Sequence, residues 1–224
     1  MTTALRPLGR LLDLALPAVC PGCGTEGAPI CARCLPAVRS RVGLPAGTPL
    51  GLGDGPPAPL LQLEWCAPFT GVVRGALHAL KYAGERRIAT PLGEVMAVRW
   101  REAGAGGELL VPVPVHERRR RERGYDQAEL LALETGRLLR LPVATAVTRE
   151  RATTAQYRLD RRHRADNVRD AFGVRPEARR MVRGRWVVLV DDVVTTGATL
   201  CAAADALLDA GAAAVSAVTV ARER

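Results

Sequence analysis

The sequence contains a single lysine, Lys81, although it has 32 basic side chains in 224 residues. A P-loop ATPase binds phosphate through a glycine-rich loop that ends in Gly-Lys-Ser or Gly-Lys-Thr. Lys81 stands between Leu80 and Tyr82, so the chain has no such loop. This excludes a P-loop ATPase. The apolar run 186–190 with the two acids after it would otherwise suit the Walker B strand of such an enzyme.

Aromatic residues and long apolar runs are also scarce. Aromatics make up 4% of the chain, which argues against a platform that stacks successive bases of a single strand. No apolar run reaches the about 20 residues that a membrane-spanning helix needs. The leucine-rich segment 3–16 contains charged residues and is followed by no small-residue cleavage site, so it predicts a short amphipathic helix. We therefore expect a cytoplasmic protein with no membrane insertion.

The charge that is present is strongly basic. The formal net charge is +9 and the sequence pI is about 10.1, which favours acidic partners such as phosphates or nucleic acid. Nearly all the basic residues are arginines, which suit bidentate phosphate contacts, although a GC-rich genome produces the same bias. The length allows one ordinary domain and a small appendage.

Four of the six cysteines form two Cys-x-x-Cys pairs near the start, namely Cys20, Cys23, Cys31 and Cys34. Four thiolates at this spacing suit a tetrahedral Zn²⁺ ion. Two disulfides are the alternative in an oxidising compartment, and a redox pair of the thioredoxin type would need a βαβ context. We predict a structural zinc site.

The remaining chain divides by composition. Residues 43–60 are rich in glycine and proline and predict a linker, which gives an N-terminal helix and zinc module at 1–42 and a larger domain at 61–224. Hydrophobic patterns in that domain predict alternating strands and helices. The expected strands are 62–69, an edge strand, 109–115, whose two prolines imply a strand end or a kink, and 146–149, 186–190 and 213–221. The expected helices are 72–82, 88–100, 127–139 and one that begins after 199.

The stretch 186–200 carries the main chemical signal. An unbroken apolar run, typical of a strand buried on both faces, stops at Asp191 and Asp192. A turn of hydroxyl and small residues at 195–199 then leads into a helix, whose N-terminal N–H groups suit a phosphate. The adjacent carboxylates suit sugar hydroxyls or hydrated Mg²⁺. The plain alternative is an exposed acidic turn after a core strand.

A second charged segment follows the strand 109–115. Five arginines, Arg118, Arg119, Arg120, Arg121 and Arg123, precede a helix that Asp126 and Glu129 cap as a capping box. We expect this loop to clamp pyrophosphate; a solvated charge run is the alternative. The basic segment 151–170 predicts a long loop that closes over an anionic ligand.

These features resemble two nested families. The stretch 186–200 resembles the phosphoribosyl pyrophosphate (PRPP) signature of type I phosphoribosyltransferases. The whole chain resembles the ComF/GntX (competence protein F) family through the cysteine quartet, 80–82, 111–114, 123–127, 151–156, 164–172 and that signature. The resemblance implies an α/β protein with a Rossmann-like type I phosphoribosyltransferase fold, a central parallel sheet and a small N-terminal zinc-binding module. One departure is Asp126, where the family usually has Asn.

The resemblance also implies the site. Asp191 and Asp192 would be the catalytic pair and would hold the ribose hydroxyls. The implied cofactors are a structural Zn ion and Mg bound with PRPP. The implied PRPP-binding residues are Asp191, Asp192, Val193, Val194, Thr195, Thr196, Gly197, Ala198 and Thr199. No residue stands out as general base for the unknown acceptor, and His116 is the nearest candidate.

The implied role is natural transformation, in which the protein would handle incoming single-stranded DNA alongside a competence helicase and single-stranded DNA loading proteins. A phosphoribosyltransferase of unknown acceptor is one hypothesis. A non-catalytic protein that senses PRPP or serves as an adaptor for DNA-handling partners is the other. The arginine excess also predicts weak, sequence-insensitive binding of single-stranded DNA.

Overall fold

The computed structural model describes residues 17–47, 55–149 and 171–223. The helix expected at 3–16 and the basic loop expected at 151–170 lie outside this part of the chain, as do residues 48–54 of the expected linker. No helix of the described part is long and apolar enough to cross a membrane.

Four parallel strands form the central sheet in the order β1-β6-β5-β2. They are β1 (Leu63–Pro68), β2 (Leu109–Pro112), β5 (Trp186–Val194) and β6 (Ala214–Arg222). Their apolar runs fit a sheet that is covered on both faces. The central parallel sheet is therefore confirmed, and β1 is an edge strand as predicted.

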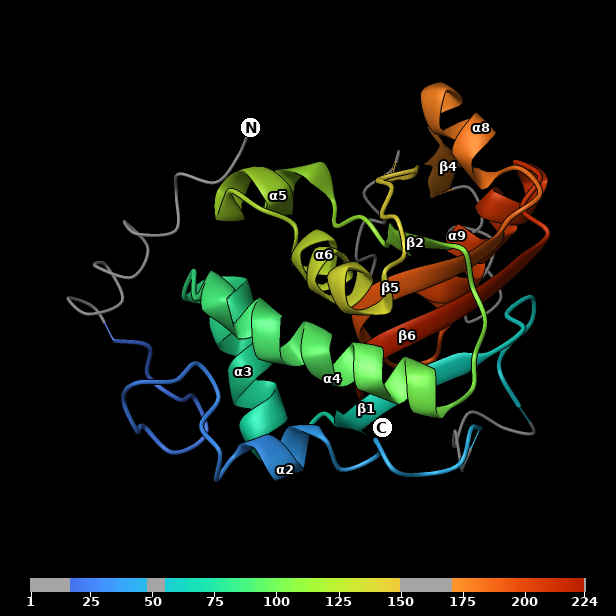
Figure 1. Ribbon diagram of the computed structural model, residues 1–224. Helices are drawn as coiled ribbons and strands as arrows, with labels where there is room; N and C mark the ends of the chain where they lie inside the picture. Colours follow the sequence, from blue (N-terminus) through green and yellow to red (C-terminus); the bar gives the residue numbers. More distant parts are fainter. Residues whose placement is uncertain (1–16, 48–54, 150–170, 224) are drawn as a thin grey trace, which may run out of the picture.

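Successive residues of β5 belong to two different cores, as the period of two in a strand requires. Val188 and Val190 pack into the core formed with α3, α4 and α6, whereas Val187 and Leu189 pack into the core formed with α9. The helices are α3 (Gly71–Tyr82), α4 (Ala89–Glu102), α6 (Gln127–Leu139) and α9 (Ala198–Asp209). Figure 1 shows α3, α4 and α6 in front of the sheet and α9 behind it.

Two strands do not end at the predicted residue, and one of them ends at a proline that the sequence marked as a strand end or a kink. β2 ends at Pro112 instead of 115, because proline has no N–H for a ladder, although Val113 still donates to the Val190 carbonyl at 2.9 Å. β5 does not stop before Asp191 but continues to Val194, because β6 runs beside it to the end. Asp191 and Asp192 thus lie inside a strand near its carboxyl end.

The arginine segment is a helix, not the loop that the sequence predicted. It forms α5 (Glu117–Arg123), which ends at Gly124 with a left-handed φ of 75°. The remaining elements are short: α2 (Leu35–Val38), η1 (Arg86–Ile88), β3 (Val147–Arg149), β4 (Phe172–Val174), η2 (Pro176–Ala178) and α8 (Arg179–Val182). β3 and β4 pair antiparallel beside α9.

The N-terminal module shares a core with the larger domain. Cys20, Cys34 and Val38 belong to the same apolar cluster as α3, α4 and the sheet. The chain after the module is also anchored, because the fully buried Arg99 pairs with the fully buried Glu64 at 2.5 Å and donates to the carbonyls of residues 41, 42, 44 and 45. The division at 42 and 60 stays a prediction.

Candidate functional site

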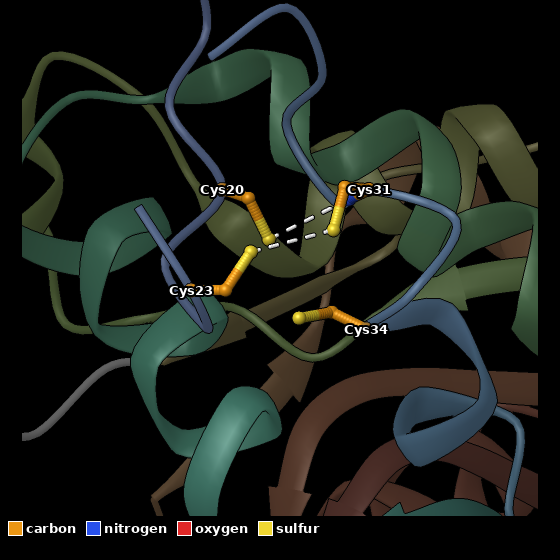
Figure 2. A group of neighbouring side chains, drawn as sticks. All are labelled: Cys20, Cys23, Cys31 and Cys34. Carbon is orange, nitrogen blue, oxygen red and sulfur yellow. Dashed lines mark hydrogen bonds between the residues drawn. The ribbon is translucent and has the colours of Figure 1, made fainter. Parts of the chain in front are cut away.

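The four N-terminal cysteines converge on one point. Their sulfur atoms all lie within 4.8 Å of one another, and Figure 2 shows the side chains pointing toward a common centre. Zn–S bonds of about 2.3 Å place the sulfurs of a tetrahedral site about 3.8 Å apart. The Cys23 and Cys31 sulfurs are 3.5 Å apart, too far for a disulfide. The donor set therefore fits a structural zinc ion.

The thiols of this cluster favour different protonation states. Hydrogen bonds with Thr25 lower the pKa of Cys23 to about 5, whereas burial, with the nearby cysteines, raises the pKa of Cys34 to about 12. Four thiolates in so small a volume repel one another unless a cation lies among them. Zn²⁺ at the centre would supply that charge, because it is bound by thiolates and displaces their protons.

The second site lies at the carboxyl end of β5. The Asp192 side chain forms an ion pair with Lys81 from the last turn of α3, with Nζ and Oδ2 2.6 Å apart. The neighbouring Asp191 accepts a hydrogen bond from the Asp192 backbone N–H at 2.8 Å. Ligands of open α/β sheets bind outside this edge of the strands, so the position fits the site that the sequence predicted.

The electrostatics of the carboxylate pair favour a cationic or hydrogen-bonding ligand. Burial raises the pKa of Asp191 well above its ordinary value, and the charge of Asp192 adds to this effect. The charge of Lys81 lowers the pKa of Asp191, whereas the charge of Asp126 raises it further. A cation or several hydroxyl donors would therefore stabilise the ionised pair.

Asp126 forms its half of the predicted capping box, whereas the Glu129 carboxylate pairs with Arg120. Its side chain accepts hydrogen bonds from the Ala128 and Glu129 N–H groups at the start of α6 and, with the other oxygen, from Val115 N–H. Burial raises the pKa of Asp126 against these hydrogen bonds. Both oxygens of the Asp126 carboxylate, which stands where the family usually has Asn, thus accept hydrogen bonds from backbone N–H groups.

The turn after β5 leads to a helix whose N-cap residue has no side chain. Gly197 is the N-cap of α9, has a φ of 83°, and offers no side chain to the first-turn N–H groups. Thr195 and Thr196 are exposed, and the Thr196 hydroxyl accepts from Ala198 N–H at 3.4 Å. Such a helix start, with the positive end of its dipole, binds phosphate well. A Cβ on Gly197 would lie 2.9 Å from Pro57 Cγ, so the position requires glycine.

The five arginines of the predicted pyrophosphate clamp separate into two groups. Three have a carboxylate partner: Arg118 with Glu122 at 2.8 Å, Arg121 with Glu117 at 2.6 Å, and Arg120 with Glu129 at 3.6 Å. Within the described ranges no carboxylate pairs with Arg119 or Arg123. Only these two arginines remain available for an anionic ligand without breaking an ion pair.

Lys81 is a candidate site residue that the sequence did not assign to the site. It stood out as the single lysine and as part of the Leu-Lys-Tyr match at 80–82, but it lies more than 100 positions from Asp192, so no local pattern connected the two. Arg149 was missed as well. Burial and the charge of Arg119 lower the pKa of Arg149, whereas the charge of Asp191 raises it, so Arg149 interacts with residues of the candidate site. His116, the candidate general base, accepts Arg118 N–H on Nδ1 at 3.2 Å as the N-cap of α5.

Several known sequences are similar to this chain. A family model described as a phosphoribosyl transferase domain matches residues 139–224. The DNA utilization protein YhgH of Escherichia coli K12 is 35% identical over 203 residues, 88% of this chain and 81% of that protein. Competence protein F of Haemophilus influenzae is 38% identical over 94 residues, 42% of this chain and 41% of that protein. Competence protein ComFC of Bacillus subtilis is 34% identical over 115 residues, which are 51% of this chain and 44% of that protein.

Solved structures show a more distant likeness. The structure of glutamine PRPP amidotransferase from Bacillus subtilis, complexed with ADP and GMP, superposes with a TM-score of 0.41 and 20% sequence identity. The superposition covers 60% of this chain but only 27% of that one.

Proposed function

Because this chain belongs to the ComF family and has its phosphoribosyltransferase-type fold, we propose that it binds PRPP with Mg²⁺ at the carboxyl end of β5. Its relatives are named for competence and for DNA utilization. We extend this role to the chain itself, as a cytoplasmic protein that handles incoming single-stranded DNA with a helicase and loading proteins. Free cysteines in a metal-ligand arrangement suit a reducing compartment.

The observation that carries the proposal is the meeting of two features at one strand end. The Asp191–Asp192 pair could accept hydroxyl hydrogens of a ribose, and the start of α9, which has no N-cap side chain, could offer N–H groups to its 5′-phosphate. Residues 191–199 would thus hold the ribose 5-phosphate portion of PRPP. Mg²⁺ would supply positive charge beside the pyrophosphate oxygens.

The pyrophosphate would lie toward the cationic side of the site. Lys81 already contacts Asp192, and Arg119 lies close enough to affect Arg149. In a transferase these cations would stabilise the charge that develops on departing pyrophosphate, and the carboxylates would favour the cationic ribose carbon. Arg118, Arg120 and Arg121 are held by carboxylates, which narrows the clamp to Arg119 and Arg123.

Thermal unfolding with and without PRPP and Mg²⁺ tests the proposal. The ligand should raise the melting temperature, because it binds the folded chain only. Gly197→Ala should abolish the shift, because its Cβ would contact Pro57 and displace the phosphate turn. Gly184→Ala is the matched control: it has the same left-handed backbone, with a φ of 72°, and no neighbour within 4 Å.

The two glycine variants share the cost of a side chain at positive φ, about 1–3 kcal/mol. Only Gly197 also lies in the proposed site, so only its variant should lose the ligand shift. A full PRPP shift in Gly197→Ala, or no shift in the unchanged chain, would contradict PRPP binding at 191–199.

A non-catalytic role is the second candidate, and the position of His116 favours it. The Nδ1 atom of this residue already accepts a backbone hydrogen bond. A PRPP sensor or adaptor requires no general base, whereas a transferase must activate its acceptor. Release of pyrophosphate from PRPP across a panel of bases and amines distinguishes the two: release shows a transferase, and binding without release supports the sensor.

Weak, sequence-insensitive binding of single-stranded DNA also follows from the net charge of +9. Its affinity should fall steeply with salt. Arg119→Gln should lower the slope of log affinity against log salt by up to about one unit. Arg121→Gln should change that slope less, because Glu117 already neutralises Arg121.

A further inference from the structure

A pocket of about 440 Å³ lies beside the proposed PRPP site, between the end of α3 and α5. Lys81 lines it and also contacts Asp192, so one side chain joins the pocket to the carboxylate pair. The volume falls within the roughly 300–1,000 Å³ of small-molecule sites. The other lining residues are Tyr82, Gly84, Arg119, Glu122, Arg123 and Tyr125.

Tyr125, which also lines the pocket, is held in place by its neighbours. The Tyr125 ring is buried, its hydroxyl donates to the Leu80 carbonyl in the last turn of α3, and the Arg86 guanidinium lies 4.5 Å over its ring. Tyr125 thereby links the start of α6 to the end of α3. A pocket lined by so fixed a side chain is already formed before a ligand binds.

One wall of the pocket is the aromatic ring of Tyr82. This tyrosine is 65% exposed, which is unusual for a large aromatic side chain in a chain with so few. Its ring contacts His78 one turn earlier, with centroids 4.8 Å apart, and the Arg123 guanidinium lies 5.0 Å over it. An aromatic ring and a guanidinium plane both stack nucleobases, so this exposed pair of side chains suits a base.

Three of the lining residues come from one face of α5. Arg119, Glu122 and Arg123 have the i, i+3, i+4 spacing that places side chains on the same side of a helix. The two arginines are those that have no carboxylate partner in the described part of the chain, whereas Glu122 pairs with Arg118. The pocket therefore combines cationic groups for a phosphate with a carboxylate that can accept from a ring N–H.

Pyrophosphate alone accounts poorly for this pocket. It needs no aromatic wall, it would be repelled by Glu122, and it is far smaller than the available volume. Lys81, which contacts Asp192, and Arg119, whose charge acts on Arg149, suffice for the pyrophosphate of PRPP. Tyr82, Glu122 and Arg123 are left for a second ligand that has both a planar ring and a negative charge.

We propose that this pocket binds a nucleotide, with its base stacked on Tyr82 and its phosphate held by Arg123. The nucleotide is either free or the end of a single strand, since both present a base next to a phosphate. The site is separate from the ribose 5-phosphate site at 191–199, so it stands even if PRPP does not bind there.

Calorimetry with 5′-dTMP, thymidine, pyrophosphate and a short 5′-phosphorylated oligothymidylate tests the proposal. 5′-dTMP should bind, and Tyr82→Ala should weaken it about tenfold, the loss expected of one stacked base. Tyr82→Phe should retain the affinity, because the ring remains. Thymidine should bind less tightly than 5′-dTMP, and Arg123→Gln should remove most of that difference.

Two control variants separate this site from general effects. Leu133→Ala truncates another exposed apolar side chain, on α6, and Arg180→Gln removes an exposed arginine on α8; neither should change nucleotide affinity. Tighter binding of the oligonucleotide than of 5′-dTMP, still dependent on Tyr82, identifies the strand end as the source, and the reverse identifies the free nucleotide.

The proposal is overturned if 5′-dTMP does not bind, or if Tyr82→Ala and Arg123→Gln leave its affinity unchanged in chains that melt normally. If pyrophosphate binds with the same affinity as 5′-dTMP and Tyr82→Ala does not change that affinity, the pocket holds the pyrophosphate end of PRPP instead. PRPP binding at 191–199 is tested by a different experiment, the melting shift with the Gly197 and Gly184 variants. Either proposal can therefore be contradicted while the other stands.

Discussion

The cysteine cluster and the carboxylate site lie at opposite ends of one helix. Near the start of α3, a Cβ on Gly22 would lie 2.7 Å from Val72 and 2.9 Å from the Cys34 sulfur, so the module packs directly on the helix. At the other end, Lys81 contacts Asp192. One site is built from a single short segment of the chain, whereas the other is assembled from several distant segments.

This difference separates what holds the two sites together. The cysteines have each other within 4.8 Å and need only a metal ion to be stabilised. The carboxylate pair depends on α3 to bring Lys81 to it and on β6 to hold its strand. The module should therefore affect the second site through α3, while changes at the second site should leave the module intact.

Metal removal should have the largest effect. Zinc should be present at one per chain, and its removal, or Cys34→Ser, should lower the free energy of unfolding by more than the about 2–5 kcal/mol of a large core truncation. The loss should extend beyond the module, because Cys20 and Cys34 share the core of α3. Elemental analysis and thermal unfolding with a chelator measure both effects.

Cys201→Ser is the control for that experiment, since Cys201 lies on α9, outside the cluster. It should retain zinc and most of the stability. A Cys34→Ser chain with an unchanged melting temperature and full PRPP binding would contradict the coupling of the two sites through α3.

Arg99 should have the next largest effect, because it connects the segment after the module to the sheet. Arg99→Met would leave the Glu64 carboxylate buried without its partner, and we expect a loss of about 3–5 kcal/mol in the free energy of unfolding. Adding Glu64→Gln should restore part of it, because the uncompensated charge is gone. Denaturant unfolding of both variants measures the difference, and equal losses in the two would contradict this account.

Local patterns predicted the local features. Cysteine spacing gave the cluster, the apolar runs gave the parallel sheet, and Asp126 was correctly identified as the cap of α6. The helix α5 was missed because it has no apolar periodicity, although its i, i+4 pairs, Arg118 with Glu122 and Arg121 with Glu117, favour a helix.

The contacts between distant segments could not be predicted. Glu64 in β1 and Arg99 in α4 gave no sign that they would pair, because a single sequence records no spatial neighbours. The ion pair of Lys81 with Asp192 is of the same kind. The sequence thus contains the donor atoms of both sites but defines the geometry of only the cysteine cluster.

Lys81 tests the assembled site directly. Lys81→Met should weaken Mg²⁺-PRPP binding by about tenfold, the loss expected when a hydrogen bond to a charged group is removed. It should also raise the pKa of Asp191 further, because Lys81 opposes that rise. Calorimetry at several pH values measures both, with Lys81→Arg as the variant that keeps the charge. Zinc content should not change.

The raised pKa of Asp191 fixes the sign of that pH dependence. An acid whose pKa in the folded chain exceeds its unfolded value, near 3.9 for Asp, contributes stability below that value and loses it as the pH rises through the folded pKa. The ligand-free chain should therefore lose stability from this group as the pH rises above about 4. Mg²⁺-PRPP, which prefers the ionised pair, should bind more tightly over the same range.

Asp126→Asn should have the smallest effect and the most specific one. Asparagine caps a helix as well as aspartate, but the variant removes a charge that raises the pKa of Asp191. The pH dependence of PRPP binding should move to lower pH, with a gain of about twofold in affinity on its acidic side. Asp209→Asn, at the far end of α9, should leave the pH profile unchanged. A profile that moves to higher pH in Asp126→Asn would show that Asp126 assists the carboxylate pair instead of opposing its ionisation.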